Sequence, residues 1–257
     1  MKKVVSLLLV AVMMLSLVAC GSSNKEDKEK LIVGTEAGFA PYEYLKGNEV
    51  VGIDMDIAKA IADAMGMELE IKNMDFDGAL EAVQSGKVDF VAAGVSVSPE
   101  RQQVMDFSHE YVNSTEVVVV NKANPAVVVA GGDELTGSAL DGKVVAVQQG
   151  NIADIWVSNK DNCSPKEVKR YTKFAQAAED LKNGKVDCIV MDKFPADELI
   201  AANEELTALD GVLFEDKYAI AVKKGNTELL NKINEVIDKL IADGKIDEFT
   251  ANHAQSK

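Results

Sequence analysis

The sequence predicts an α/β protein built from two lobes with a cleft between them. Short apolar segments of strand length alternate with amphipathic helical segments, which is typical of α/β domains. One helix–turn–strand unit occurs twice, as GALEAVQSGKVDF at residues 78–90 and as QAAEDLKNGKVDC at residues 176–188. Two apolar segments, 116–120 and 218–222, follow the first and second copies. We therefore expect one lobe per copy and two hinge strands that cross between the lobes.

The N-terminus predicts export and lipid anchoring. Two lysines precede an apolar run over residues 4–18, and Ala19 stands before Cys20, which describes a signal peptide over residues 1–19. The run is short for a membrane-spanning helix. Residues 17–20 (LVAC) resemble a bacterial lipobox, whose cysteine is lipidated. We expect a flexible tether over residues 20–30 and a location on the extracytoplasmic face of the cell membrane; the alternative is an ordinary secretory signal with an incidental cysteine.

Charge and cysteine content narrow the function classes. The formal net charge is −15, and loss of Lys2 and Lys3 with the signal would make it −17. A chain this acidic is a poor match for nucleic acid, which needs a positive face. Cys163 and Cys188 remain after export, where a disulfide is permitted, but their pairing cannot be determined from the sequence.

The elements follow from local patterns. In the first lobe we expect strands at 31–33, 68–71 and 88–92, a helix that Asp54 caps and Gly66 ends, and a helix over 77–85 ended by Gly86. The last helix spans roughly 227–243 and stops at Gly244. We expect lobe I to comprise residues 31–113 and 217–257, and lobe II residues 114–216.

The segment from Ser85 to Ser108 carries the clearest binding signal. Gly94 permits close approach of the backbone to a ligand, and Ser96 supplies a hydroxyl. Ser98-Pro99 is a good helix start, which places Arg101 in a first turn where an anion is already favoured. A guanidinium at this position suits a small carboxylate held through two hydrogen bonds.

The second copy of the repeat ends in Asp192, at the point where the first copy leads into the Gly94–Arg101 segment. Ligands of α/β proteins usually bind beyond the carboxyl ends of strands. We therefore expect the two polar segments to face each other across the cleft.

Together these segments resemble the polar amino acid-binding family (family 3) of extracytoplasmic solute-binding proteins, which serve ABC importers. The resemblance covers almost the whole chain after the tether. It rests on GTEAGFAPYEY at 34–44, GIDMDIAKAIA at 52–62, the 85–108 segment, KVVAVQQGN at 143–151 and DCIVMDK at 187–193. It implies a type II periplasmic-binding-protein-like fold that closes on its ligand. It also implies a free L-amino acid, polar or basic, as ligand and an ABC permease as partner. We expect a monomer, because the cleft alone needs no second chain, and no cofactor or metal, because the sequence shows no P-loop, Rossmann glycine pattern or zinc-ligand spacing.

The resemblance also implies roles for individual residues. Arg101 would grip the ligand α-carboxylate, aided by Ser96 and the Gly94 backbone, and Asp192 would receive the α-ammonium. The turn at Asn151 and Ile152 would bind the carboxylate from lobe II, although the family often has threonine at the position of Asn151.

Four further positions would surround the ligand side chain. Phe39 and Phe76 would enclose it between their rings. Glu36 would lie at the far end of the pocket, where an acid suits a guanidinium, ammonium, imidazole or amide group, and Gln148 would line the same region.

Two other functions stay open. A dehydratase on the same fold would need a general base, a role that Glu36 could take, and a sensor would signal through closure without feeding a transporter. Neither His109 nor His253 has a nucleophile or metal partner at useful spacing, so we expect a binding protein rather than an enzyme.

Overall fold

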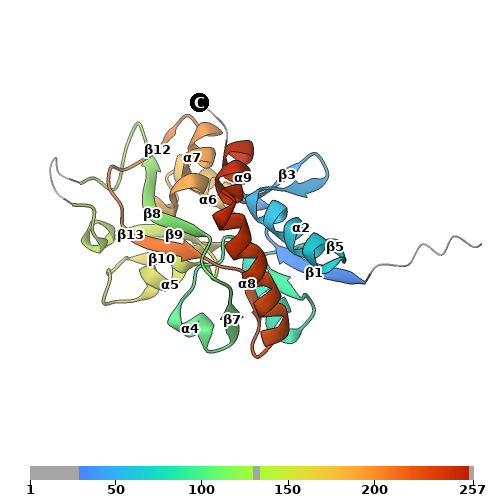
Figure 1. Ribbon diagram of the computed structural model, residues 1–257. Coiled ribbons are helices and arrows are strands. Elements are labelled where there is room, and N and C mark those ends of the chain that lie inside the picture. Colours follow the sequence, from blue (N-terminus) through green and yellow to red (C-terminus); the bar gives the residue numbers. More distant parts are fainter. Residues whose placement is uncertain (1–28, 130–133, 255–257) are drawn as a thin grey trace, which may run out of the picture.

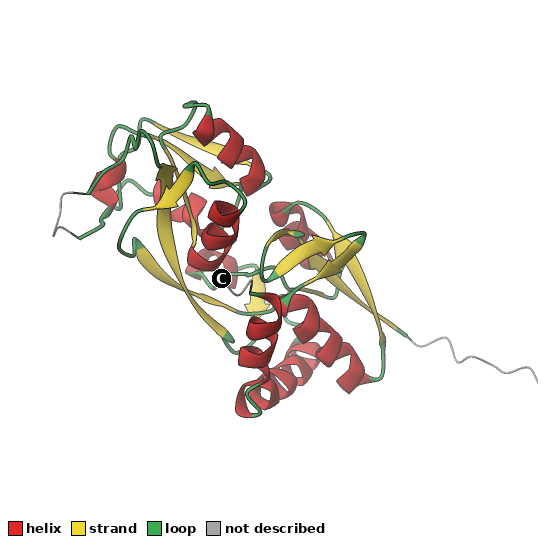
Figure 2. Cartoon of the chain, turned by 90° about the horizontal axis from the view of Figure 1, so that it is seen from above, coloured by secondary structure: helices red, strands yellow, loops and turns green. Residues whose placement is uncertain are grey.

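The computed structural model describes residues 29–129 and 134–254 as two α/β lobes that lie side by side (Figures 1 and 2). The predicted fold class is confirmed. The predicted signal peptide and Cys20 lie outside the described residues, as does most of the tether. Within the described ranges, no helix is long and apolar enough to cross a membrane.

Lobe I is built around a five-stranded sheet in the order β5-β1-β6-β14-β7, with β1 parallel to β5 and β6, and β14 antiparallel to β6 and β7. A small antiparallel sheet, β2-β3-β4, stands beside it. The strands are β1 (Lys30–Thr35), β2 (Gly38–Phe39), β3 (Glu43–Lys46), β4 (Glu49–Val51), β5 (Glu68–Asn73), β6 (Phe90–Val91), β7 (Met105–Phe107) and β14 (Ala221–Lys223). The helices are α2 (Ile53–Met65), α3 (Phe76–Ser85), α4 (Pro99–Gln102), α8 (Thr227–Ala242) and α9 (Lys245–His253).

Lobe II contains the second sheet, in the order β10-β9-β11-β8-β12, with β13 paired to another part of β8. Its strands are β8 (Val112–Asn121), β9 (Val144–Gln148), β10 (Glu167–Tyr171), β11 (Cys188–Asp192), β12 (Leu206–Ala208) and β13 (Phe214–Tyr218). Its helices are η1 (Gly137–Leu140), α5 (Ile152–Ser158), α6 (Phe174–Lys182) and α7 (Lys193–Ala201).

The two copies of the repeat adopt equivalent structures. Each places a helix before a buried strand: α3 precedes β6, and α6 precedes β11. Strand β6 pairs in parallel with β1, and β11 pairs in parallel with β9. The repeated aspartates make the same contact: Asp89 accepts a hydrogen bond from the Ile32 N–H at 2.7 Å, and Asp187 accepts one from the Val144 N–H at 2.7 Å. The sequence repeat therefore reflects one structural unit used once in each lobe.

Two chain crossings connect the lobes and bond to each other. One runs from β7 into β8 and the other from β13 into β14. Ser108 and Ile220 bond through the Ser108 N–H and the Ile220 carbonyl at 2.9 Å, and the Tyr111 N–H donates to the Tyr218 carbonyl at 3.0 Å. The predicted returning strand over 218–222 is in fact split into β13 and β14, because each half joins a different sheet. The expected lobe boundaries, at 113–114 and 216–217, fall within β8 and β13 and stay predictions.

The prediction that Asp54 caps a helix is wrong. Gly52 is the N-cap of α2, with φ 137°, and a Cβ there would lie 2.1 Å from the Tyr42 carbonyl oxygen, so the chain requires glycine at this position. Asp54 is instead fully buried inside the first turn. Its carboxylate accepts hydrogen bonds from the Gly94 N–H and the Tyr111 hydroxyl, both at 2.8 Å.

Helix α8 ends before Gly244 as predicted and packs against α2 (Figure 1). The short helix α9 that follows was not predicted. Both Cys163 and Cys188 are buried free thiols. Burial raises the pKa of the Cys188 thiol to about 12, so this residue behaves as a core side chain.

Candidate functional site

The structure brings the predicted site residues together in one closed cavity between the lobes. The free space left inside is about 10 Å³, roughly room for a single water molecule, so the lobes are tightly closed. Nine of the ten predicted residues line this cavity, and the tenth, Arg101, bonds at its edge. The lining residues are Glu36, Phe39, Glu43, Phe76, Ala93, Gly94, Ser96, Gln148, Asn151, Ile152 and Asp192.

Arg101 bridges the two lobes. As predicted, Ser98 caps helix α4 by accepting the Arg101 N–H at 3.2 Å, and Pro99 takes the first helical position. The guanidinium donates to the Ser96 carbonyl at 2.6 Å in lobe I and to the Gly150 carbonyl at 2.9 Å in lobe II. Burial lowers its pKa to about 10, opposed by the nearby carboxylates, so Arg101 stays cationic at neutral pH.

The lobe II turn presents an unused donor to the cavity. Asn151 caps α5 through its Oδ1, which accepts the Asp154 N–H at 2.9 Å. Its Nδ2 group is buried, and no acceptor in the described structure reaches it. Ile152 is the first residue of α5, so its N–H has no acceptor within that helix. The Asn151 side chain can therefore donate a hydrogen bond to a ligand, although the family often has threonine at this position.

Asp192 lies at the end of β11 in a network of hydroxyls and acids. Its Oδ1 accepts hydrogen bonds from the Tyr218 hydroxyl and from Ser114 Oγ, the latter at 3.1 Å. Glu116 is its neighbour across β8 and β11, and no donor among the described residues reaches either Glu116 carboxyl oxygen. Burial raises the pKa of Asp192 to about 6 and that of Glu116 well above its usual value. A protonated Glu116 that donates to Asp192 satisfies both groups.

Glu36 is a further acid in the cavity lining, and it is 1% exposed. Its Oε2 accepts from Gln148 Nε2 at 3.0 Å, and its Oε1 pairs with Lys173 Nζ at 3.0 Å. Both partners belong to lobe II. Lys173 was not predicted to lie at the site.

Two aromatic rings, Phe39 and Phe76, also line the cavity. Phe39 stacks on Phe174 of lobe II, with ring centroids 6.1 Å apart, and the Arg101 guanidinium lies 5.5 Å from the Phe76 ring centroid. Phe174 was missed, although the repeat could have found it, because it stands 98 residues after Phe76 at the equivalent helix start.

A second buried acid pair supports the lobe I wall and was also missed. Glu43 lines the cavity and is fully buried, and within residues 29–129 and 134–254 no group donates a hydrogen bond to its carboxyl oxygens. Its neighbour is Asp54. Burial raises the pKa of Asp54 to about 6, and burial together with Asp54 and Glu36 raises the pKa of Glu43 well above its usual value. A protonated Glu43 can donate to Asp54, so the pair shares a proton.

This pair predicts a pH-dependent cost to stability. Between about pH 4 and pH 6 the unfolded chain releases the Asp54 proton, which the folded chain keeps, and for Glu43 this range extends to higher pH. The free energy of unfolding therefore falls as the pH rises through this range. Glu43→Gln keeps a donor without the charge. We expect its midpoint of thermal unfolding to gain several degrees over the unmodified protein at pH 8 and little at pH 4. Glu49→Gln, at an exposed site, is the control; an offset that is the same at both pH values would contradict the shared proton.

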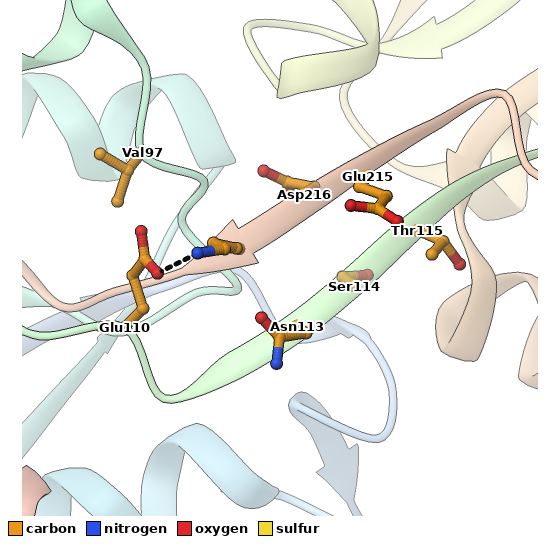
Figure 3. A pocket seen from close by; sticks show the side chains of 8 residues that line it. Val97, Glu110, Asn113, Ser114, Thr115, Glu215 and Asp216 are labelled. Atoms are coloured by element: carbon orange, nitrogen blue, oxygen red, sulfur yellow. Dashed lines mark hydrogen bonds and ion pairs between the residues drawn. The ribbon is translucent and has the colours of Figure 1, made fainter.

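A larger and more open hollow of about 530 Å³ runs along β8 and β13 (Figure 3). None of the predicted residues lines it. Its charged groups Glu110 and Lys217 pair with each other at 2.7 Å, and Asp216 at its inner side accepts from Ser96 Oγ at 2.5 Å. The predicted residues converge on the closed cavity instead.

Both histidines have partners outside the cavity lining. His109 pairs with Asp238 at 2.7 Å, and His253 contacts Asp56 at 2.9 Å. Neither is placed to act on a molecule held beside Asp192 or Glu36.

Comparison with known proteins gives a consistent result. The family model for bacterial extracellular solute-binding proteins, family 3, matches residues 31–256. The arginine-binding extracellular protein ArtP of Bacillus subtilis is 31% identical over 258 residues, covering 97% of this chain and 96% of ArtP. The L-cystine-binding protein TcyJ of Escherichia coli is 29% identical over 230 residues, covering 88% of this chain and 83% of TcyJ.

Solved structures agree. The amino acid ABC transporter substrate-binding protein AbpA from Streptococcus pneumoniae, bound to L-arginine, superposes with a TM-score of 0.79 at 32% identity, covering 88% of this chain and 94% of AbpA. An ancestral arginine-binding protein bound to glutamine gives a TM-score of 0.77 at 36% identity, covering 89% and 99%. With a family match that extends over nearly all the described residues, this chain belongs to the bacterial extracellular solute-binding proteins, family 3.

Proposed function

We propose that the protein captures one free L-α-amino acid between its lobes and delivers it to the membrane permease of an ABC importer, held at the membrane by a lipid on Cys20. The observation that carries the proposal is the arrangement of charge in the cavity. The cavity brings the Arg101 guanidinium together with two carboxylates, Asp192 and Glu36, and with the phenyl rings of Phe39 and Phe76. This set of groups suits the carboxylate, ammonium and side chain of an amino acid.

The polar groups proposed to hold the ligand here hold the lobes to each other. Arg101 bonds the Gly150 carbonyl, and Glu36 bonds Gln148. With so little free space inside, a ligand enters only after these contacts open. It would then replace them with its own, and the lobes would close again around it. The ligands named for related proteins make L-arginine the first candidate ligand and L-glutamine the second.

The test is binding of each natural L-amino acid to purified protein that has been unfolded, dialysed and refolded to remove any carried-over ligand. A ligand at a hundredfold excess over its dissociation constant stabilises the folded state by about 2.7 kcal/mol, a clear shift of the unfolding midpoint. We expect one or a few L-amino acids to give this shift and their D-enantiomers to give none. No shift with any amino acid would refute the proposal.

We propose binding without catalysis. A dehydratase would require a general base beside the substrate; neither histidine lines the cavity, and the remaining candidate, Glu36, pairs with Lys173, which suits a counter-charge rather than a proton acceptor. Turnover of a cyclic hydroxy acid by the purified protein would revive the enzyme alternative.

A further inference from the structure

Lys173 places a positive charge on Glu36, the cavity acid expected to face the far end of the ligand side chain. Its Nζ lies 3.0 Å from Glu36 Oε1, while Gln148 occupies the other oxygen. The Gln148 amide is itself held in lobe II, where Nε2 also donates to the Thr172 carbonyl at 3.1 Å. Both Glu36 oxygens are therefore engaged by lobe II donors when the lobes are closed.

The two members of this ion pair differ in exposure. The Glu36 side chain is 1% exposed and the Lys173 side chain 44% exposed. A buried carboxylate strongly favours a nearby cation, whereas a lysine on a flexible stem can move into solvent at modest cost. Glu36 is thus the fixed partner and Lys173 the displaceable one.

This pair decides the charge that the far end offers to a ligand. With Lys173 in place, the carboxylate is neutralised, and an amide or other neutral polar side chain meets no uncompensated charge. A guanidinium or ammonium meets a like charge and must displace Lys173 to reach Glu36.

Resting on the proposed amino-acid function, we propose that Lys173 is a specificity-determining residue that shifts selection away from cationic side chains and toward neutral polar ones by competing for Glu36. Lys173 precedes Phe174 at the start of α6, so the lobe II segment that closes on Phe39 also brings this charge to Glu36.

The ion pair also joins the two lobes, which gives a second explanation to separate from the first. A contact that only favours closure affects every ligand equally, whereas competition for Glu36 affects cationic ligands alone. The comparison must therefore use two ligands of the same shape and different charge. L-arginine and L-citrulline meet this need, because citrulline replaces the guanidinium with a neutral urea.

The experiment measures calorimetric affinities of both ligands for the refolded protein and for Lys173→Met, Glu36→Gln and the control Lys169→Met. Lys169 pairs with Asp180 inside lobe II, and Lys185 still pairs with Asp180 after the change. We expect Lys173→Met to raise the affinity for arginine relative to citrulline by about tenfold. This change lies between the effect on affinity of losing an exposed ion pair and that of losing a buried one. Glu36→Gln should lower the ratio, and Lys169→Met should leave it unchanged.

Each outcome decides the proposal. If the unmodified protein binds only neutral amino acids, then arginine binding by Lys173→Met would support competition between Lys173 and the ligand for Glu36 just as well as the expected change in ratio. Equal changes for both ligands would assign Lys173 to closure alone and overturn the inference while leaving amino-acid binding intact. Failure of the unmodified protein to bind any amino acid would instead refute the proposed function, and the role of Lys173 with it.

Discussion

Replacing Arg101 with alanine is expected to abolish useful amino-acid binding. Loss of one partner of a buried, hydrogen-bonded charge pair typically costs about 2–5 kcal/mol, which corresponds to a roughly 30- to 5,000-fold weaker affinity. The cost is large because the ligand carboxylate would enter a closed, nearly dry cavity with no cation beside it. Calorimetry with the best natural ligand measures the change directly.

The chain contains a matched control for this experiment. Arg170 is also a paired arginine, bonded to Asp154 on lobe II, but it does not line the cavity. We expect Arg170→Ala to bind the ligand normally and Arg101→Lys, which keeps the charge without the planar fork, to fall between. Circular dichroism checks that each variant is folded. A folded Arg101→Ala protein with ordinary affinity would remove the carboxylate role.

Much of the fold was predictable because it repeats. The helix–turn–strand unit occurs twice with its glycine turn and its aspartate, and Asp89 and Asp187 make the same strand-edge contact. Helix ends were also predicted correctly where a single residue defines the end by its own chemistry. Ser98 caps α4 with its hydroxyl, and Gly86 ends α3 in the left-handed conformation that glycine adopts easily. Asp54 failed because an acid near a helix start is also a good buried acceptor, and the sequence does not say which role applies.

The candidate site divides in the same way. Gly94, Ser96, Arg101 and Asp192 could be found from the residues because they follow the strands of the two repeat copies, whose carboxyl ends face the cleft. The other predicted positions came from the family resemblance.

Glu43, Glu116 and Lys173 were missed because the role of each depends on a partner that the local sequence pattern does not reveal. Glu43 depends on Asp54 in helix α2, and Glu116 depends on Asp192 in strand β11. Lys173 depends on Glu36 from the other lobe. A glutamate directly before the valine run at 117–120 was the one visible sign of the Glu116 pair.

Asp192→Asn is expected to separate binding from stability. Carboxyl oxygens from Glu116, Asp192 and Asp216 lie within 4.8 Å of one another, so the folded protein holds the like charges of Asp192 and Asp216 close together beside a protonated Glu116. Asparagine removes one charge, can still accept from Tyr218, and can donate to Glu116. The variant should therefore unfold at a higher temperature than the unmodified protein near neutral pH, where the raised pKa of Asp192, about 6, leaves the cost of its charge fully present.

The same change should weaken amino-acid binding by about 2–5 kcal/mol, because the ligand ammonium would lose its counter-charge. Asp216→Asn tests the assignment, since Asp216 belongs to the acidic cluster but not to the cavity lining. It should also raise the unfolding midpoint while costing much less affinity. Higher stability with weaker binding in Asp192→Asn would mean that the cluster is retained for the ligand at the expense of the fold. Normal binding in Asp192→Asn would contradict the ammonium role, and lower stability would contradict the electrostatic argument for the cluster.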